Sequence, residues 1–256
     1  MACCMSIFFT DLDNTLIYSH HRGISKPRIV VEHLNGREQS FMTQFTYDFL
    51  CSANWLTIVP VSTRTEHQYR RIECTEKLRY KYAIVCNGGK LLIDDKEDEE
   101  WSLQSDILVS ESYDSLEQAT EFLSHLIPGE VVHRPEKYMR YAKCNDPESV
   151  YEELRNIIDL NKVNVQRDGR KVYIFANGIS KGKAIERFKQ KKEFKNIIAA
   201  GDNLMDVSML NKADYAFVHK NIANKVECRN KHVIEKALMS DEICSYLNKM
   251  RIEGII

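Results

Sequence analysis

The sequence SIFFTDLDNTL, residues 6–16, joins a short apolar run to two carboxylates, Asp11 and Asp13. Residues 6–9 show no polar alternation, which is typical of a strand covered by helices on both faces of its sheet. In open α/β sheets, ligands bind beyond the carboxyl ends of the strands. This stretch therefore predicts a buried parallel strand that ends at a site containing two acids.

Four more apolar runs have the same character. They lie at residues 56–61, 82–86, 196–200 and 214–218. Helical patterns at residues 66–80 and 183–192 separate some of these runs. Repeated strand–helix–strand units indicate an α/β fold with a doubly wound parallel sheet.

The middle of the chain has a different pattern. Residues 94–100 (DDKEDEE) are predicted to form a solvated surface turn, because charge runs usually face water. A helix is expected at residues 114–127, where Asp114 and Glu117 have the spacing of a capping box. A second helix is expected to begin at Asp146-Pro147, since Asp is a good N-cap and Pro is tolerated at the first helical position.

The alternation of residues 162–176 around Asp168-Gly169 predicts a β-hairpin. Two helices and alternating strands suggest a small α+β domain. We therefore expect an α+β cap domain at residues 90–175, inserted into a catalytic core made of residues 1–89 and 176–256.

Composition limits the possible functions. The 256 residues include 36 Lys and Arg against 37 Asp and Glu, which gives a net charge of −1. This balance argues against a general nucleic-acid or anionic-membrane partner. We find no transmembrane run, no basic signal-peptide start and no CxxC pair among the eight cysteines. The expectation is a reduced, cytoplasmic protein.

Polar clusters follow the predicted strands. Ser62-Thr63-Arg64 follows the second run, Asn87-Gly88-Gly89 the third and Gly201-Asp202-Asn203-Leu204-Met205-Asp206 the fourth, while Lys181 begins a helix. Four carboxylates would then share one crevice: Asp11, Asp13, Asp202 and Asp206. Like charges at this spacing repel strongly, and oxygen ligands favour Mg²⁺, so we expect Mg²⁺ as the cofactor.

The remaining groups suit phosphoryl transfer. Ser62, Lys181 and nearby backbone amides could bind the phosphate oxygens. One carboxylate could act as nucleophile, and a second could act as its acid–base partner.

The set DxDxT, hydroxyl residue, lysine and GDxxxD, in that order, resembles the haloacid dehalogenase superfamily. The position of the insert resembles the Cof-type branch, which includes sucrose-phosphate phosphatase-like sugar phosphatases. The resemblance implies that Asp11 is the nucleophile that becomes an aspartyl-phosphate. Asp13 would be the acid–base residue, and its backbone carbonyl would bind Mg²⁺. Asp202 and Asp206 would be further metal ligands, with Asp206 binding the ion directly or holding Lys181.

The resemblance also assigns supporting roles. Ser62 would bind the transferring phosphoryl group, and Lys181 would neutralise charge on it. Thr63 is an alternative donor of the hydroxyl, because the common Thr-Gly-Arg is here Ser62-Thr63-Arg64. The predicted substrate-binding set is Thr15, Thr63, Arg64, Asn87, Asn203 and, in the cap, Arg140.

The implied activity is Mg²⁺-dependent hydrolysis of a small phosphorylated metabolite, with a sugar phosphate as the first expectation. Two alternatives stay open at this point. One is a sugar phosphomutase, which would isomerise its substrate without releasing phosphate. The other is a catalytically silent protein that binds a phosphorylated ligand. The sequence indicates no oligomeric state.

Overall fold

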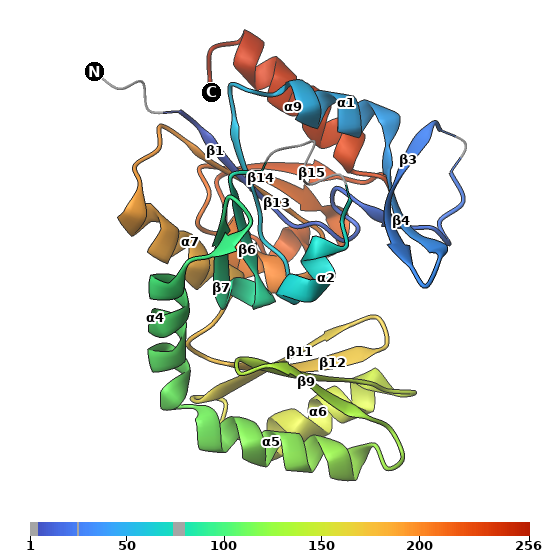
Figure 1. Ribbon diagram of the computed structural model, residues 1–256, viewed down its shortest axis with the longest axis vertical. Helices are drawn as coiled ribbons and strands as arrows, with labels where there is room; N and C mark the ends of the chain where they lie inside the picture. Colours follow the sequence, from blue (N-terminus) through green and yellow to red (C-terminus); the bar gives the residue numbers. More distant parts are fainter. Residues whose placement is uncertain (1–4, 25, 74–79) are drawn as a thin grey trace.

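The computed structural model describes residues 5–24, 26–73 and 80–256. Its main sheet contains five parallel strands in the order β15-β14-β13-β1-β5 (Figure 1). These strands are β1 (Ile7–Thr10), β5 (Thr57–Pro60), β13 (Ile197–Gly201), β14 (Tyr215–His219) and β15 (Asn230–Ile234). The doubly wound parallel sheet is therefore confirmed, and β15 is a strand that the sequence patterns did not predict. The run at residues 82–86, expected in this sheet, instead forms a strand of a separate antiparallel sheet.

Helices cover both faces of the main sheet. Two of them, α1 (Gln44–Ser52) and α9 (Ser240–Ile252), pack on one face, where Phe8 and Ile198 belong to the same apolar cluster. Three others, α4 (Glu99–Ser110), α7 (Lys181–Lys191) and α8 (Val207–Leu210), pack on the opposite face. Phe9 of β1 meets Phe188 of α7 edge to face there, with ring centroids 5.6 Å apart.

Two small antiparallel sheets flank the main one. The first contains β6 (Tyr82–Val85), β7 (Lys90–Ile93) and β8 (Lys96–Glu97), and the single bridge Val61–Ile84 joins it to the main sheet. The second contains β2 (Tyr18–Ser19), β3 (Arg28–Leu34) and β4 (Arg37–Thr43). The tight turn between β3 and β4 is Asn35-Gly36, and both residues have positive φ.

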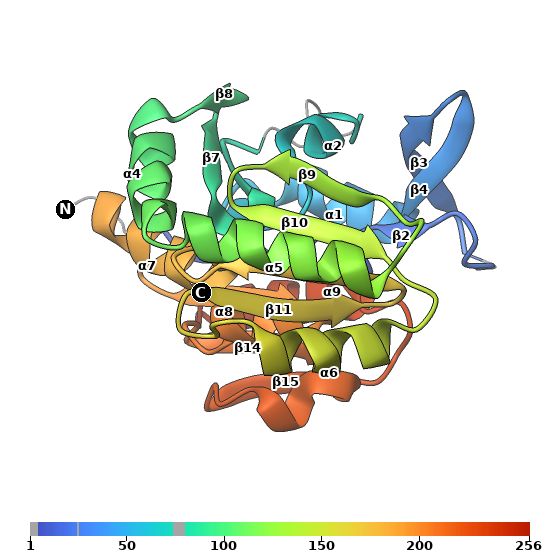
Figure 2. The same ribbon diagram turned by 90° about the horizontal axis from the view of Figure 1, so that it is seen from below.

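The inserted unit has a four-stranded antiparallel sheet in the order β11-β12-β10-β9. Its strands are β9 (Val132–Glu136), β10 (Met139–Lys143), β11 (Val163–Asp168) and β12 (Lys171–Ala176). Two helices, α5 (Tyr113–Leu126) and α6 (Pro147–Ile157), pack on one face. The other face of this sheet looks toward the core (Figures 1 and 2). The predicted hairpin around Asp168-Gly169 and the predicted N-cap Asp146 are both present.

The acidic run has a structural role that the sequence analysis did not predict. Residues 94–95 turn the chain, and Asp98 caps α4 by accepting a 2.9 Å bond from the backbone N–H of Trp101. Trp101 is fully buried in the core, and its ring N–H donates to Gly88 O at 3.1 Å. Since β7 and α4 contact the core, we propose that the cap begins after α4 rather than at residue 90.

Two other details of the sequence analysis need correction. The predicted capping box of Asp114 and Glu117 is wrong, because α5 begins at Tyr113 with Ser112 as its N-cap. The helix expected at residues 66–80 is described only as α2 (Glu66–Arg70), and residues 74–79 of that stretch lie outside the described residues.

The remaining short elements of the described residues are 3-10 helices: η1 (Cys86–Gly88), η2 (Leu204–Asp206) and η3 (Lys220–Lys225). Within the described ranges, no helix is both long enough and apolar enough to cross a bilayer. The five cysteines recorded there, Cys51, Cys86, Cys144, Cys228 and Cys244, are free thiols, whereas Cys3, Cys4 and Cys74 lie outside the described residues.

Candidate active site

The chemistry-bearing side chains gather at the carboxyl ends of β1, β5 and β13. Asp11 directly follows β1, Asp206 lies in η2 just beyond β13, and Lys181 is the first residue of α7. The Lys181 Nζ atom lies 2.5 Å from Asp11 Oδ1 and 2.5 Å from Asp206 Oδ1. All three residues are buried, so one ammonium group bridges two carboxylates away from bulk water.

Glycines let the backbone come close enough to build this arrangement. A Cβ atom on Gly201 would lie 2.4 Å from Asp206 Cβ, and a Cβ on Gly88 would lie 2.7 Å from Ser180 O. Ser180 caps α7 by accepting a bond from Lys183 N–H, so Gly88 allows η1 to pack directly on the start of that helix. These close approaches fix Asp206 and Lys181 relative to each other.

A metal ion would fit among three of the acids. Asp11, Asp202 and Asp206 each offer a carboxylate oxygen within 4.8 Å of the others. Burial, despite the nearby Lys181, raises the pKa of Asp11 well above its usual value, with further contributions from Asp206 and Asp202. Burial and the charge of Asp206 raise the pKa of Asp202 to about 7. A divalent cation would stabilise these crowded charges, and carboxylate oxygens suit Mg²⁺.

Supporting bonds hold the acidic residues in place. Asp206 Oδ2 accepts bonds from the backbone N–H groups of Asp202 and Asn203, both at 3.0 Å. Thr15 Oγ1 donates to Asp202 Oδ1 at 3.2 Å. Thr15 is fully buried, so its position fits support of Asp202 and not the predicted contact with substrate.

Asp13 has a different environment. Its carboxylate is half exposed and accepts a bidentate pair of hydrogen bonds from Arg64, with Nε–Oδ2 and Nη2–Oδ1 distances of 2.7 Å each. Desolvation favours the neutral acid, but the bonds and charge of Arg64 outweigh it, so the pKa of Asp13 lies below its usual value. The side chain of Asp13 is not one of the three clustered carboxylates.

The second predicted motif lies beside β5. Ser62 is buried, and its Oγ accepts a 3.1 Å bond from Arg64 N–H, whereas Thr63 lines the adjacent cleft. Asn87 N–H donates to Ser62 O at 2.9 Å, and the buried Asn87 Oδ1 is among the atoms without a hydrogen-bond partner in the described part of the chain. These contacts place Asn87 beside the motif-two turn without giving it a substrate contact.

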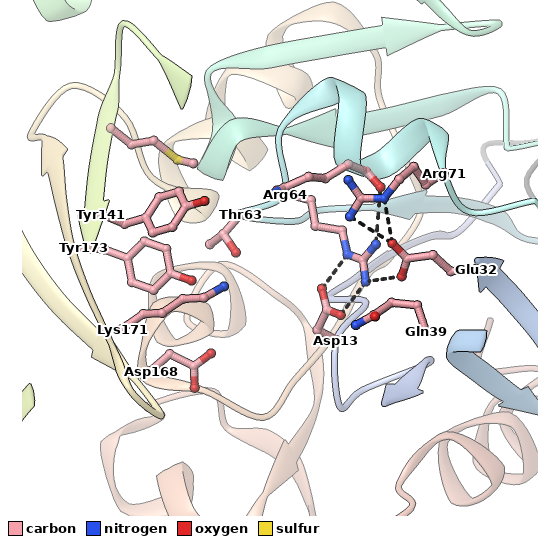
Figure 3. Close-up of a pocket in the computed structure, with 12 residues that line it drawn as sticks. Asp13, Glu32, Gln39, Thr63, Arg64, Arg71, Tyr141, Asp168, Lys171 and Tyr173 are labelled. Carbon is pink, nitrogen blue, oxygen red and sulfur yellow. Dashed lines mark hydrogen bonds and ion pairs between the residues drawn. The ribbon is translucent and has the colours of Figure 1, made fainter. Parts of the chain in front are cut away.

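A cleft of about 300 Å³ lies between the core and the cap (Figure 3). The core side is lined by Asp13, Thr63, Arg64 and Arg71, with Glu32 and Gln39 from the β3–β4 hairpin. The cap side is lined by Met139, Tyr141, Asp168, Lys171 and Tyr173. The cleft therefore adjoins the predicted acid–base residue and has an aromatic wall.

Strand alternation explains which cap residues face the cleft. In β10, Met139 and Tyr141 line the cleft, while Arg140 points to the helical face. There Arg140 Nη2 lies 2.5 Å from Glu117 Oε1 of α5, and Arg140 is buried. The predicted substrate role of Arg140 does not fit this position, because the side chain ties the sheet to α5.

Several residues of the cleft were missed by sequence reasoning. Lys171 and Tyr173 alternate with apolar residues in β12, a pattern that predicts a two-faced strand without showing which face meets the site. Glu32 belongs to none of the motifs found in the sequence. The Asn35-Gly36 dipeptide, flanked by alternating residues, was the available signal for its hairpin.

A hydrogen bond joins the cap to the loop that carries Asp202 and Asp206. Asn203 Nδ2 donates to Asp168 Oδ1 at 2.8 Å, between the core and the tip of the β11–β12 hairpin. Met205 of the core also belongs to an apolar cluster with Met139, Tyr173 and Phe175 of the cap. The Asn203 side chain therefore does two things at once. Its oxygen is the N-cap of η2, and its nitrogen donates to the cap domain.

Comparisons with known proteins agree with this arrangement. Residues 129–241 match the family model described as haloacid dehalogenase-like hydrolase. A comparison with curated protein sequences gives no match.

Solved structures match over nearly the whole chain. The sucrose-phosphatase of Synechocystis sp. PCC6803 has a TM-score of 0.65 at 14% identity, covering 96% of this chain and 98% of its own. A phosphatase of Bacteroides thetaiotaomicron has a TM-score of 0.57 at 14% identity, covering 99% and 96%. The trehalose-6-phosphate phosphatase of Aspergillus fumigatus has a TM-score of 0.52 at 11% identity, covering 96% and 93%.

At these identities the structural matches establish the fold, and the matched segment contains Lys181, Asp202 and Asp206. The chain therefore has the fold of these capped phosphatases, and residues 129–241 are similar to the haloacid dehalogenase-like hydrolase family.

Proposed function

We propose that this protein is a Mg²⁺-dependent phosphatase that hydrolyses a small phosphorylated metabolite through an aspartyl-phosphate on Asp11. The observation that supports this most directly is the buried Lys181, whose ammonium bridges Asp11 and Asp206 beside a third acid, Asp202. A carboxylate nucleophile, a neutralising cation and a cluster of oxygen ligands are the parts that phosphoryl transfer needs.

In the first step, an oxygen of the Asp11 carboxylate forms a bond to phosphorus while the bond from phosphorus to the leaving oxygen breaks. Asp13 gives a proton to that leaving oxygen. Lys181 stabilises the negative charge that collects on the phosphoryl oxygens. Ser62 is the proposed hydroxyl partner of that group.

In the second step, a water oxygen forms a bond to the phosphorus of the aspartyl-phosphate while the bond from phosphorus to the Asp11 oxygen breaks, and Asp13 accepts the proton of that water. Inorganic phosphate leaves, and the Asp11 carboxylate is restored. Arg64 keeps Asp13 charged when no substrate is present, which suits this role as base. An arriving phosphate dianion raises the proton affinity of a neighbouring acid, which suits the earlier role as acid.

Asp11, Asp202 and Asp206 would hold the Mg²⁺ ion, together with the backbone carbonyl of Asp13. When bound, the ion supplies positive charge that lets the anionic phosphate approach the anionic nucleophile. The chemistry of the donor set fits, because the described carboxylates outnumber the single nearby ammonium.

We favour a sugar phosphate as the substrate class. The structural neighbours include a sucrose-phosphatase and a trehalose-6-phosphate phosphatase. The cap side of the cleft presents the neighbouring rings of Tyr141 and Tyr173, with centroids 5.6 Å apart and planes tilted by 36°. Aromatic faces can pack on the apolar faces of a sugar, and Lys171 adds a cation to the same wall.

The test is phosphate release from a panel of phosphorylated metabolites, with and without Mg²⁺, for the wild type and for Asp11→Asn. We expect Mg²⁺-dependent release by the wild type and a loss of more than about 10⁴-fold in the variant, because an amide cannot replace the carboxylate nucleophile.

Circular dichroism and the melting temperature should show that Asp11→Asn remains folded. Full activity of this variant would contradict the assignment of the nucleophile. Isomerised substrate without phosphate release would instead indicate a phosphomutase. Ligand-induced stabilisation without any turnover would indicate a binding protein.

A further inference from the structure

Glu32 is a buried carboxylate next to the active site, on a strand that carries no part of the phosphatase motifs. It lies in β3, within the β3–β4 hairpin, and its side chain is 1% exposed. The pairing of β3 with β4 shifts register on both sides of Glu32. This irregularity coincides with a side chain that lines the cleft instead of the hairpin surface (Figure 3).

Three donors hold the Glu32 carboxylate. Oε2 accepts from Arg64 Nη2 at 3.0 Å and from Ser40 Oγ at 2.7 Å, and Oε1 accepts from Arg71 Nε at 3.0 Å. Desolvation would favour the neutral acid, but the bonds and charge of Arg64, with help from Ser40 and Arg71, lower the pKa of Glu32. Glu32 is thus a fixed, charged anchor.

Arg64 connects this anchor to the reaction. Its guanidinium donates two bonds to Asp13 and one to Glu32, and it lies between the two carboxylates (Figure 3). The Arg64 side chain is only 11% exposed. A guanidinium is planar, so fixing one edge on Glu32 also fixes the edge that holds Asp13.

We propose that Glu32 is a positioning residue that orients Asp13 through Arg64, so that the Asp13 carboxyl group meets the leaving oxygen of the substrate. The proposal rests on the proposed function, since it concerns the proton transfer assigned to Asp13. Glu32 itself does not touch the reacting atoms. Its effect is confined to the acid–base residue, because Asp11 and Lys181 are held by other contacts.

This confinement gives a specific experimental signature. An alkyl phosphate needs a proton on its leaving oxygen, whereas p-nitrophenolate departs as a stable anion without one. A misplaced Asp13 therefore slows the first step, formation of the aspartyl-phosphate, for alkyl phosphates and spares it for p-nitrophenyl phosphate. The second step, in which Asp13 is the base, slows equally for both substrates, so the two substrates differ only in the first step. Damage to the nucleophile, to metal binding or to the fold slows both substrates together.

The experiment measures the single-turnover rate of leaving-group release, which reports the first step alone, for the best alkyl phosphate of the panel and for p-nitrophenyl phosphate, in the wild type and in Glu32→Gln. We expect this rate to fall at least about tenfold for the alkyl phosphate and to stay within about threefold for p-nitrophenyl phosphate, in line with typical effects of general acids. The matched control is Glu38→Gln, on the neighbouring strand β4, where the carboxylate is 50% exposed and pairs with Arg28.

Equal losses of the first-step rate on both substrates, or no loss on either, would overturn the role of Glu32 while leaving the phosphatase assignment intact. A wild type that hydrolyses neither substrate would overturn the proposed function and this inference with it. If Glu32→Gln does not fold, the double variant Glu32→Gln/Arg71→Met replaces it, because it also removes the guanidinium left without its carboxylate partner. The same selective loss is expected there, and an unselective loss would overturn the proposal.

Discussion

The ammonium of Lys181 lies among groups that would repel each other without it. Breaking a buried ion pair costs several kcal/mol because the remaining charge is left in a poorly solvated place. Here one cation serves Asp11 and Asp206, and Asp202 lies close by. The residues of this site therefore depend on each other for stability as well as for chemistry.

At the scale of single residues, Gly201→Ala is a sharp perturbation. The added methyl group would lie 2.4 Å from Asp206 Cβ and 2.6 Å from its Cγ, so Asp206 would have to move away from Lys181. We expect a loss of about 1–3 kcal/mol in the free energy of unfolding, together with a large loss of phosphatase activity. Urea denaturation and phosphate release measure the two effects.

Gly23→Ala is the control for that substitution, since a Cβ atom on Gly23 meets nothing within 4 Å. It should change neither stability nor activity measurably. If Gly201→Ala behaved like Gly23→Ala, the tight contact with Asp206 would have no functional importance.

Sequence reasoning brought the acids and Lys181 together because buried parallel strands end at a common edge. It did not predict what each side chain would contact. Arg140 was expected at the substrate, yet strand alternation turns it toward Glu117. Glu32 was not singled out, because a lone acid in an amphipathic strand reads as a solvent-facing residue until its partners are known.

At the scale of secondary-structure elements, Asp241 joins three segments. It lies in the first turn of α9, and its Oδ1 accepts bonds from Thr43 Oγ1 at 2.5 Å and from Thr46 Oγ1 at 3.1 Å. Lys26 also contacts its Oδ2. Because Thr43 is the N-cap of α1, one carboxylate links α9 to the start of α1 and the end of β4.

This carboxylate predicts a pH dependence of stability. Desolvation would raise the pKa of Asp241, but the bonds from Lys26, Thr43 and Thr46 lower it overall. A lowered pKa in the folded state means that the contribution is complete above the unfolded pKa of about 4 and is lost as pH falls through the folded pKa. Asp241→Asn should therefore cost about 1 kcal/mol at about pH 7, and this difference should shrink in acid.

Urea denaturation at stepped pH, from about pH 7 to about pH 3, measures the difference for this variant. Asp48→Asn serves as the control, because Asp48 is exposed on α1 and contacts only Gln44 among the bonds described for it. A difference for Asp241→Asn that grew toward acid would contradict the sign.

The secondary-structure elements that could be predicted are those whose residue types are set mainly by burial. β1, β5, β13 and β14 have both faces covered and read as continuous apolar runs. β15 is an edge strand with the sequence NKHVI, and its polar residues interrupt the apolar run by which the other strands were recognised. The acidic start of α4 resembled a surface turn because helix caps and turns prefer the same residues.

At the scale of the whole molecule, one described polar contact between the cap and the core is Asn203–Asp168, which lies beside the clustered acids because Asn203 follows Asp202. Asn203→Asp changes almost no volume and keeps the oxygen that accepts from Met205 N–H to cap η2. It also places a second carboxylate against Asp168. Like charges at such a distance repel, so we expect the cap to open.

The expected result is a larger radius of gyration in solution scattering and a higher KM for the best substrate. Both effects should decrease at high salt, because screening weakens the repulsion. Asn164→Asp is the control, since Asn164 is exposed on β11 of the same hairpin. An unchanged radius and KM in Asn203→Asp would show that this contact does not hold the cap closed.

The two-part organisation was predictable from the change between unbroken apolar runs and alternating patterns. The point where the cap begins was harder to read, because β7 and α4 belong to neither pattern. Trp101 anchors α4 to the core through a contact that only the folded chain brings together. The division into core and cap stays a proposal at that border.

The order of strands in the main sheet has a consequence for synthesis of the protein. Ile7 in β1 pairs with Ile197 in β13, and β13 also joins β14 and β15. On the ribosome, the apolar β1 therefore emerges long before the neighbour that covers one of its edges. Pairings between such distant segments form slowly and leave strand edges exposed meanwhile. Asp11 would thus be made long before Lys181 and Asp206, so a nascent chain can assemble this cluster only after Asp206 has emerged from the ribosome.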